Sequence, residues 1–112
     1  MISGPYTAGQ ADADQRARNL AAMNRTALAV FQRGHVPIIG VNLALPVIEA
    51  AKPHLADRAF DAIMMPLSLA LAERCDACLR LGGASAGADE EAARFAARGK
   101  PVYRRLEDVP SA

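Results

Sequence analysis

The chain has 112 residues, of which 52% are hydrophobic, and its 13 basic and 12 acidic residues give a formal net charge of +1. This length supports a single domain, residues 1–112, with one hydrophobic core. No apolar run reaches the ~18 residues that a membrane span requires, and the near-neutral charge excludes a strong attraction to nucleic acid polymers or anionic lipid. No basic segment followed by an apolar stretch opens the chain, so we expect a cytoplasmic protein.

The first elements alternate between strand and helix. Residues 1–6 predict a short buried strand followed by a tight turn, and residues 9–14 predict a polar loop in which Asp12 or Asp14 caps the next helix. From residue 15 to residue 33 apolar side chains recur every three or four positions, which predicts an amphipathic helix ended by Gly34.

A second buried strand is predicted over residues 37–41, where both faces are apolar as in a central parallel strand. Asn42 follows this strand directly. If the strands are parallel, Asn42 lies at the same edge of the sheet as the loop after the first strand. Its amide would then either contact a ligand or hydrogen-bond its own backbone. We interpret His35, at the other end of the strand, as structural.

The next region predicts two helices and a pair of cysteines. Residues 43–51 form a short helix closed by Pro53, and helical spacing continues from Phe60 to Leu71 across Pro66, which must kink that helix or begin a new one. Cys75 and Cys78 form a C-x-x-C pair. Because a helix ends before this pair and a strand follows it, no helix N-terminus faces the sulfurs, and we predict small core residues rather than a redox or zinc site.

The most informative stretch is residues 79–96, where an apolar strand runs into a turn of small residues and then into an alanine-rich helix. Such a junction places backbone N–H groups and a helix N-terminus at the carboxyl edge of a sheet, where open α/β folds bind ligands. Helical geometry places Glu91 on the face of Phe95, toward the sheet, and leaves Glu90 in solvent. The alternative is that the acids of this turn only complement the helix dipole.

Gly99 ends that helix and residues 101–104 predict a last strand. Alternating strands and helices predict an α/β fold, a Rossmann-like or flavodoxin-like three-layer sandwich with a parallel sheet of four to five strands.

Three groups of residues carry a family resemblance, and they follow one another over nearly the whole chain: Ile2-Ser3-Gly4-Pro5-Tyr6, Cys75-Asp76-Ala77 and Ser85-x-Gly87-Ala88-x-x-Glu91. Together they resemble the nucleoside 2-deoxyribosyltransferase superfamily, in particular its small nucleotide N-glycosidase branch. The S-x-G-x-x-x-E motif is the most specific part of the resemblance.

This resemblance implies a Rossmann-like enzyme that cleaves the bond between a base and a sugar. Glu91 falls on the nucleophile that attacks the anomeric carbon. Ser85 and Gly87 fall on the positions that bind the 5′-phosphate, and Ser3, Gly4 and Tyr6 fall on the turn that lines the sugar and phosphate. Family members are commonly homodimers or larger, and a neighbouring subunit completes the pocket. The sequence gives no reason to invoke a metal or a cofactor.

The chain departs from the family pattern at Ser68, where an aspartate usually assists departure of the base. Asp57, Asp61 and Glu73 are carboxylates that could replace it, and no spacing selects one. A second departure is Met1, where the family often has a tyrosine, a role that Tyr6 could cover. These differences leave three hypotheses open: an N-glycosidase or base-exchanging transferase, a nucleotide-binding module without turnover, and a small oligomeric domain without a ligand.

Overall fold

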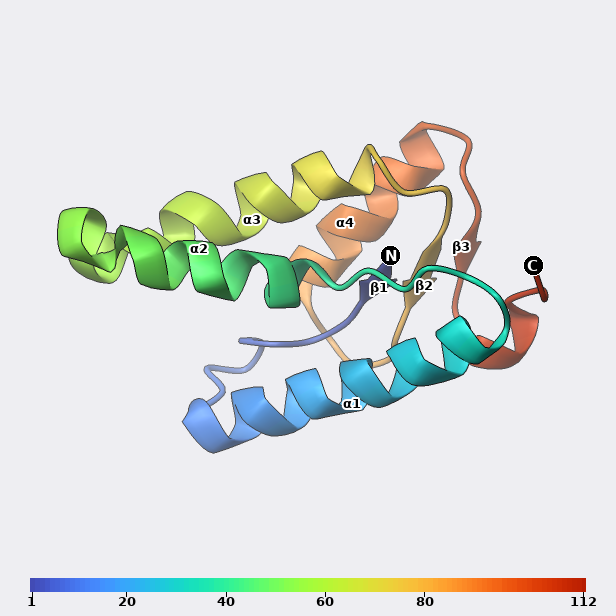
Figure 1. Cartoon of the computed structure of the whole chain (residues 1–112), viewed down its shortest axis with the longest axis horizontal. Helices are drawn as coiled ribbons and strands as arrows, with labels where there is room; N and C mark the ends of the chain where they lie inside the picture. Colours follow the sequence, from blue (N-terminus) through green and yellow to red (C-terminus); the bar gives the residue numbers. More distant parts are fainter.

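A computed structural model describes residues 1–112, and Figure 1 shows short strands surrounded by helices. The strands are β1 (Ile2–Ser3), β2 (Cys78–Arg80) and β3 (Val102–Tyr103). The helices are α1 (Ala13–Gln32), α2 (Gly40–Leu55), α3 (Ala59–Ala72) and α4 (Ala86–Ala97), with single 3-10 turns at Ala56–Arg58 and Leu106–Asp108. The result is a Rossmann-like α/β arrangement in a single unit.

The sheet has three parallel strands in the order β1-β2-β3, so the predicted four- to five-stranded sheet is wrong. The missing strand is the segment predicted over residues 37–41. It lies beside β1, and the Ile2 N–H donates to the Ile38 carbonyl at 2.7 Å. Because Pro37 has no N–H to donate and α2 already begins at Gly40, this contact does not extend into a ladder.

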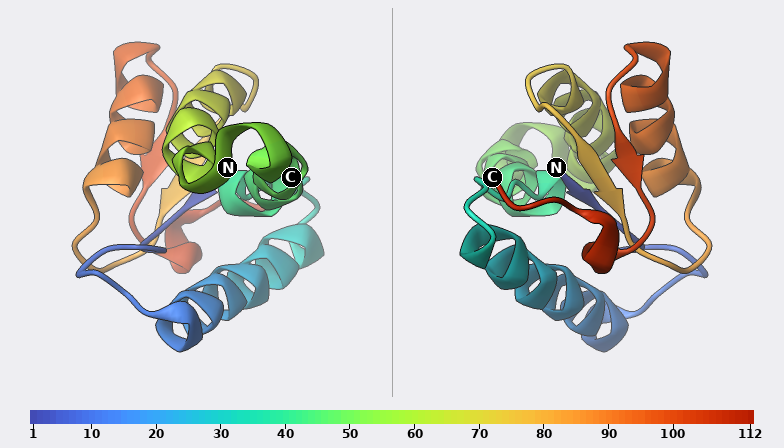
Figure 2. Two further views of the ribbon diagram at one scale, coloured as in Figure 1. Left: turned by 90° about the vertical axis from the view of Figure 1, so that its left-hand side faces the viewer. Right: turned by 90° about the vertical axis from the view of Figure 1, so that its right-hand side faces the viewer.

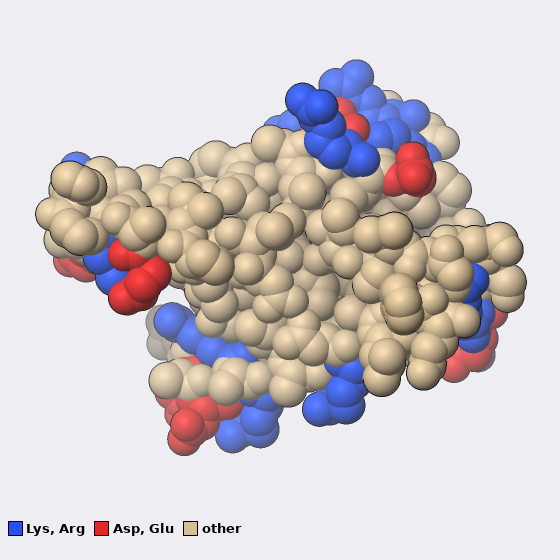
Figure 3. All heavy atoms as spheres, viewed as in Figure 1, with Lys and Arg blue, Asp and Glu red and all other residues tan.

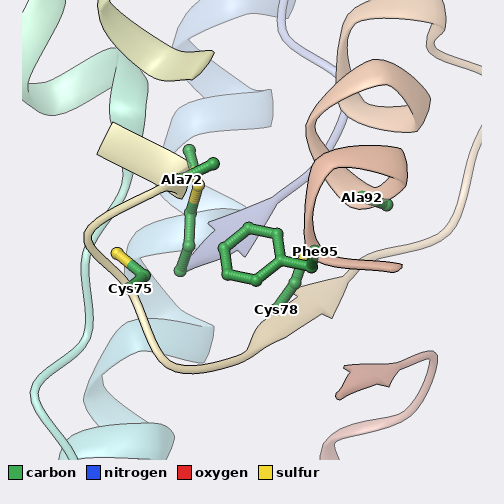
Figure 4. Packing of buried hydrophobic residues seen from close by; sticks show 6 residues of the cluster. Ala72, Cys75, Cys78, Ala92 and Phe95 are labelled. Carbon is green, nitrogen blue, oxygen red and sulfur yellow. The ribbon is translucent and has the colours of Figure 1, made fainter. Parts of the chain in front are cut away.

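Alternation along the strands divides the core between the two faces of the sheet. Figure 2 shows α1 on one side of the sheet and the other helices on the opposite side. Ile2 and Leu79 pack with Met23 of α1. On the other face, Phe95 of α4 packs with Met1, Ala72, Cys75, Cys78 and Ala92. Figure 4 labels Phe95 and its neighbours Ala72, Cys75, Cys78 and Ala92. Consecutive side chains along a strand therefore meet different helices.

The two cysteines are confirmed as core residues. Cys75 and Cys78 are buried and free, at exposures of 8% and 1%. Burial raises the pKa of the Cys78 thiol above its ordinary value, which keeps it protonated and unreactive at neutral pH.

Helices α2 and α3 form a long hairpin that packs through Ala44, Ile48, Ala59 and Met64. The prediction that Pro53 closes the first of these helices is wrong, since α2 runs on to Leu55. A proline removes one helical hydrogen bond, and packing against α3 holds the helix together across that gap. At Pro66 the sequence left two alternatives, and the structure shows one continuous helix, α3, with this proline inside it. None of the helices combines the length and apolar character that crossing a membrane requires.

Candidate functional site

Buried polar side chains gather between the sheet and the helices on the α4 side. The buried polar or charged residues are Ser3, Ser68, Arg80 and Glu91. Ser3 and Arg80 are register partners on β1 and β2, and therefore point to the same face of the sheet. Since buried polar groups are costly unless they are paired, each of these residues requires a structural or a chemical reason.

Glu91 is buried on α4 at an exposure of 9%, while Glu90 is exposed, as helical geometry predicted. Its carboxyl group takes part in none of the ion pairs or side-chain hydrogen bonds of the chain. Burial raises the pKa of Glu91 to about 7, and the charges of Arg80 and of the Met1 ammonium group offset the effect of burial only in part. Glu91 is therefore poised to exchange a proton near neutral pH.

Arg80 is buried as well, at 6% exposure, but each of its three guanidinium nitrogens donates at least one hydrogen bond. Nε and Nη2 donate to Asp89 Oδ1 at 3.1 and 3.0 Å. Nη1 donates to the Leu81 carbonyl, and Nη2 also reaches the carbonyls of Gly83 at 2.9 Å and Ser85 at 3.5 Å. One side chain thus holds the whole turn between β2 and α4.

Arg80 was not predicted as a site residue, although the sequence carries a signal for it. An arginine inside an otherwise apolar strand must find partners when it is buried. Arg80 lies two positions after Cys78 on β2, so both side chains point to the α4 face of the sheet. Asp89, in the first turn of α4, is an acid close enough in sequence to pair with Arg80 there.

The turn presents its N–H groups outward. In a trans peptide unit the C=O and the following N–H point in opposite directions. Because the Gly83 and Ser85 carbonyls face Arg80, the N–H groups of Ala84 and Ala86 face away from it. The N–H groups from Gly82 to Gly87 find no acceptor within the chain. Outward N–H groups next to a helix N-terminus are suited to binding an anion.

Ser85 and Gly87 lie in this segment, each with a structural contact of its own. Ser85 caps α4, because its Oγ accepts the Ala88 N–H at 3.1 Å. A Cβ built on Gly87 would lie 3.2 Å from the sulfur of Met65 on α3. Gly87 therefore permits close packing of α3 on α4. It also lies one helical turn before Glu91, on the same face.

The predicted turn after β1 is partly built into the core. Ser3 is buried at 1% exposure and accepts a long hydrogen bond from Cys78 Sγ at 3.6 Å. A Cβ on Gly4 would be 3.4 Å from both Leu81 and Met23. The ring of Tyr6 packs between α1 and α2, and its carbonyl accepts from Asn19. Of the predicted residues in this turn, Ser3 is the one whose side chain points to the same face of the sheet as α4 and Glu91.

Asn42 requires a correction. It is not a loop residue at a strand end but lies in the first turn of α2. Its side chain donates to Asn24 Oδ1 of α1 at 2.7 Å, on the face of the sheet opposite Glu91. The early start of α2 at Gly40 rotates this residue away from the predicted position.

None of the three carboxylates that could replace the missing aspartate is paired with Glu91. Ser68 lies tightly against the start of α2, where a Cβ on Gly40 would be only 2.3 Å from its Oγ. Glu73 binds Arg98 at 2.9 Å and Arg94 at 3.7 Å. Asp57, in the 3-10 turn before α3, and Asp61, in the first turn of α3, are both exposed. A larger side chain at position 68 would require α2 and α3 to separate.

A cavity of about 470 Å³ lies at the amino edge of the strands and not at the predicted site. Its lining is mainly apolar, with His35, Cys75 and Asp76 among the exceptions, and it includes none of the predicted site residues. We place the candidate site beside the turn that follows β2, because the Glu91 carboxyl group, which has no hydrogen-bond partner in the chain, and the free N–H groups of residues 82–87 lie on that turn and the helix after it. No cluster of His, Cys, Asp and Glu side chains in the structure is arranged to hold a metal ion.

Comparison with known proteins identifies a family whose description names no function. Residues 1–106 match the family described as "Domain of unknown function (DUF1937)". The chain belongs to this DUF1937 family. No curated protein and no solved structure matches it. The resemblance of this DUF1937 chain to nucleoside 2-deoxyribosyltransferases therefore stays a prediction.

Proposed function

We propose that this chain hydrolyses the N-glycosidic bond of a ribo- or deoxyribonucleoside 5′-monophosphate and releases the base. The observation that carries the proposal is the carboxyl group of Glu91: the residue is 9% exposed, its carboxyl oxygens have no hydrogen-bond partner in the chain and are not fully buried, and the helix that carries it follows a turn with free N–H groups. A carboxylate and an anion site at this spacing suit a substrate that joins a phosphate to a reactive acetal-like carbon.

The phosphate would bind at the turn between Gly82 and Gly87. Backbone N–H groups and the positive end of the α4 dipole supply the attraction. Ser85 could add its hydroxyl proton, because its oxygen accepts from Ala88 and its own O–H remains available. Met65 lies against Gly87, so a ligand that uses this face of α4 must displace the flexible methionine side chain.

Glu91 would act as the nucleophile. In the first step its carboxylate oxygen bonds to C1′ while the bond between C1′ and the base nitrogen breaks, and the base leaves with the electron pair and takes a proton. In the second step water attacks C1′ and gives up a proton, which balances the proton that the base took. The bond between C1′ and the Glu91 carboxylate breaks, and the sugar phosphate leaves. The two displacements together retain the configuration at C1′.

The raised pKa of Glu91 is compatible with this role. A more basic carboxylate is a better nucleophile once it is ionised, and a pKa of about 7 leaves a large ionised fraction at neutral pH. Binding a phosphate dianion close to Glu91 would raise that pKa further, whereas Arg80 opposes this shift.

A second candidate function is nucleotide binding without turnover. Ser68 stands where the resembling family has an aspartate, and the other carboxylates are exposed or bound to arginines. Departure of the base would then lack a proton donor, since a serine hydroxyl does not supply one near neutral pH. Base exchange is a variant of the enzymatic proposal, in which a second base replaces water in the second step.

The deciding experiment measures base release by chromatography from a panel of ribo- and deoxyribonucleoside monophosphates. The wild type is compared with Glu91→Gln and with Glu90→Gln, which removes the neighbouring exposed carboxylate as a matched control. We expect release by the wild type and by Glu90→Gln but not by Glu91→Gln.

Two other outcomes are informative. Saturable nucleotide binding by calorimetry, with no base released, would support the binding module. Activity retained in Glu91→Gln would rule out Glu91 as the nucleophile.

A further inference from the structure

The cavity at the amino edge of the strands, which we name the amino-edge cavity, is separate from the candidate site. Its volume of about 470 Å³ lies within the range of about 300–1,000 Å³ that is typical of small-molecule sites. It reaches both halves of the core, because Ile2 and Leu79 of its lining pack on the α1 side of the sheet and Cys75 and Cys78 on the α4 side. Protein interiors are densely packed and contain few voids. A cavity of this size in a small domain is therefore a candidate ligand site.

The lining of the amino-edge cavity is mainly apolar. Of the 17 residues that line it, 11 are hydrophobic. The aliphatic side chains among them include those of Ile2, Val30, Val36, Ile38, Leu79 and Val109. A polar group buried against such walls without a hydrogen-bond partner is costly. Most of a ligand bound here must therefore be apolar.

Val109 and Pro110 form one wall of the amino-edge cavity and are fixed to the end of α1. The guanidinium group of Arg33 donates to the Val109 carbonyl, and His35 Nε2 is bonded to the Pro110 carbonyl. Because a carbonyl oxygen can only accept, Nε2 carries the proton of this hydrogen bond. In the neutral imidazole ring the other nitrogen, Nδ1, is then an acceptor.

Two polar atoms of the lining residues are available to a ligand. His35 Nδ1 and the hydroxyl oxygen of Tyr103 have no hydrogen-bond partner within the chain. No fully buried side-chain nitrogen or oxygen of the structure lacks a partner, so both atoms are accessible. A ligand hydroxyl group can donate to Nδ1 and accept from the Tyr103 hydroxyl. The two atoms therefore suit a ligand that carries a hydroxyl group.

The charged side chains of the lining, Arg74 and Asp76, are opposite in sign. Both are exposed, and neither takes part in an ion pair within the chain. The ammonium group of Met1 donates to the Ala77 carbonyl at 2.8 Å. Residues 34–38, which also line the cavity, contain no Asp, Glu, Lys or Arg. Figure 3 shows an uncharged surface across the middle of the view, where the connection after α1 passes in front of β1 and β2 in Figure 1.

We propose that the amino-edge cavity binds a small uncharged molecule with an apolar body and a hydroxyl group, an alcohol or a phenol. An acidic ligand would meet Asp76 and a basic ligand would meet Arg74, whereas an uncharged ligand meets neither with a like charge. The cavity shares no residue with the candidate site and lies at the opposite end of the strands from the turn that precedes α4. The proposal does not depend on the proposed enzymatic activity.

The charge of the ligand is tested by calorimetry with three probes that share one apolar body. At neutral pH 2-naphthol is uncharged, 2-naphthoate is an anion and 2-naphthylmethylammonium is a cation. We expect saturable binding of 2-naphthol, with a lower dissociation constant than that of either ion. Asp76→Asn should strengthen binding of the anion, and Arg74→Gln binding of the cation, each by up to about fivefold. Neither variant should change the affinity for 2-naphthol by more than about twofold.

The position of the probe is tested by three further variants. Ala77→Phe places a ring in the amino-edge cavity and should weaken binding of 2-naphthol by roughly tenfold or more. Ala96→Phe places the same ring at an exposed position of α4 and should leave binding unchanged. Tyr103→Phe removes one hydroxyl group and should weaken binding by roughly fivefold. Circular dichroism verifies that each variant is folded.

Amide chemical shifts of the wild type locate the probe without any substitution. We expect 2-naphthol to shift the N–H signals of residues 34–38 and 76–79 and to leave those of residues 82–87 in place. Shifts confined to residues 82–87 overturn the proposal, because the probe would then occupy the candidate anion site. So does 2-naphthol that fails to saturate or binds no more tightly than both ions. None of these measurements uses a nucleotide, so failure of the proposed enzymatic function leaves them unchanged.

Discussion

Arg80 and Glu91 are both buried charged residues at the carboxyl edge of the sheet, and the structure treats them in opposite ways. The guanidinium group of Arg80 is bound by Asp89 and by three backbone carbonyls. The carboxyl group of Glu91 has no such partner, and burial raises its pKa to about 7. A paired buried charge organises the backbone around it, whereas an unpaired one lowers stability and is retained where chemistry requires it.

Removing Arg80 should have the largest effect on stability. Arg80→Met leaves several carbonyls of the turn without donors, and loss of one member of a buried ionic network costs roughly 3–5 kcal/mol. Because Asp89 is largely exposed, we expect the lower end of this range. Urea unfolding measures the loss, and phosphate binding should weaken as the turn loses its shape.

Arg80→Lys is the matched control for that experiment. Lysine keeps the charge but cannot reproduce the planar set of donors that holds Asp89 and the carbonyls together. We expect partial recovery of stability with little recovery of phosphate binding. Equal recovery of both would indicate that charge alone shapes the turn, and would weaken the contrast with Glu91.

Removing the charge of Glu91 should stabilise the protein. A folded-state pKa of about 7 means that folded Glu91 keeps a proton which the unfolded chain loses near pH 4.5, so the wild type loses stability as pH rises from about 4.5 to 7. Glu91→Gln removes this loss and should gain up to about 3 kcal/mol at pH 8, and little at pH 4. Chemical denaturation at both pH values measures the difference.

Glu90→Gln serves as the comparison for this gain. Glu90 lies in the same turn of α4 but is exposed, so its replacement should change the free energy of unfolding little at either pH. If both variants gained the same free energy of unfolding at pH 8, the gain would come from the total acidic charge of α4. The burial of Glu91 would then not be its cause.

The same pKa predicts how activity depends on pH. If ionised Glu91 is the nucleophile, kcat/KM should rise with pH to a plateau above about 7 and fall roughly tenfold for each pH unit below it. Base release measured from pH 5 to pH 9 provides the profile. A rate that instead declines above pH 7 would mean that the protonated carboxyl group acts, as an acid rather than a nucleophile.

The sequence was sufficient to predict much of this edge of the molecule, for identifiable reasons. The order of strand, small-residue turn and helix was visible over residues 79–96, and helical spacing alone separated Glu91 from Glu90. Core placement of Cys75 and Cys78 followed from their position between a helix end and a strand. In each case the deciding pattern lies within a short stretch of chain.

What could not be predicted depended on contacts between distant residues. Whether residues 37–41 form a strand depends on pairing with β1, and a segment that pairs through Ile38 alone looks the same in sequence as one that pairs fully. Asn42 was misplaced for that reason. The packing of Gly40 on Ser68 and of Met65 on Gly87 likewise brings together segments separated by more than 20 positions, which periodicity does not register.

Ser85→Ala should have the smallest effect on stability of these substitutions. It tests whether Ser85 only caps α4 or also helps to bind the phosphate. Loss of an N-cap costs about 1 kcal/mol, because the Ala88 N–H loses its acceptor. Ser85→Asp restores a cap acceptor but puts a negative charge where the phosphate would bind. Urea unfolding should therefore show that aspartate recovers the stability lost with alanine, while calorimetry with a nucleoside monophosphate shows weaker binding to the aspartate variant than to the alanine variant. If affinity followed stability through the series instead, Ser85 would act only as a cap and the anion would have to bind elsewhere.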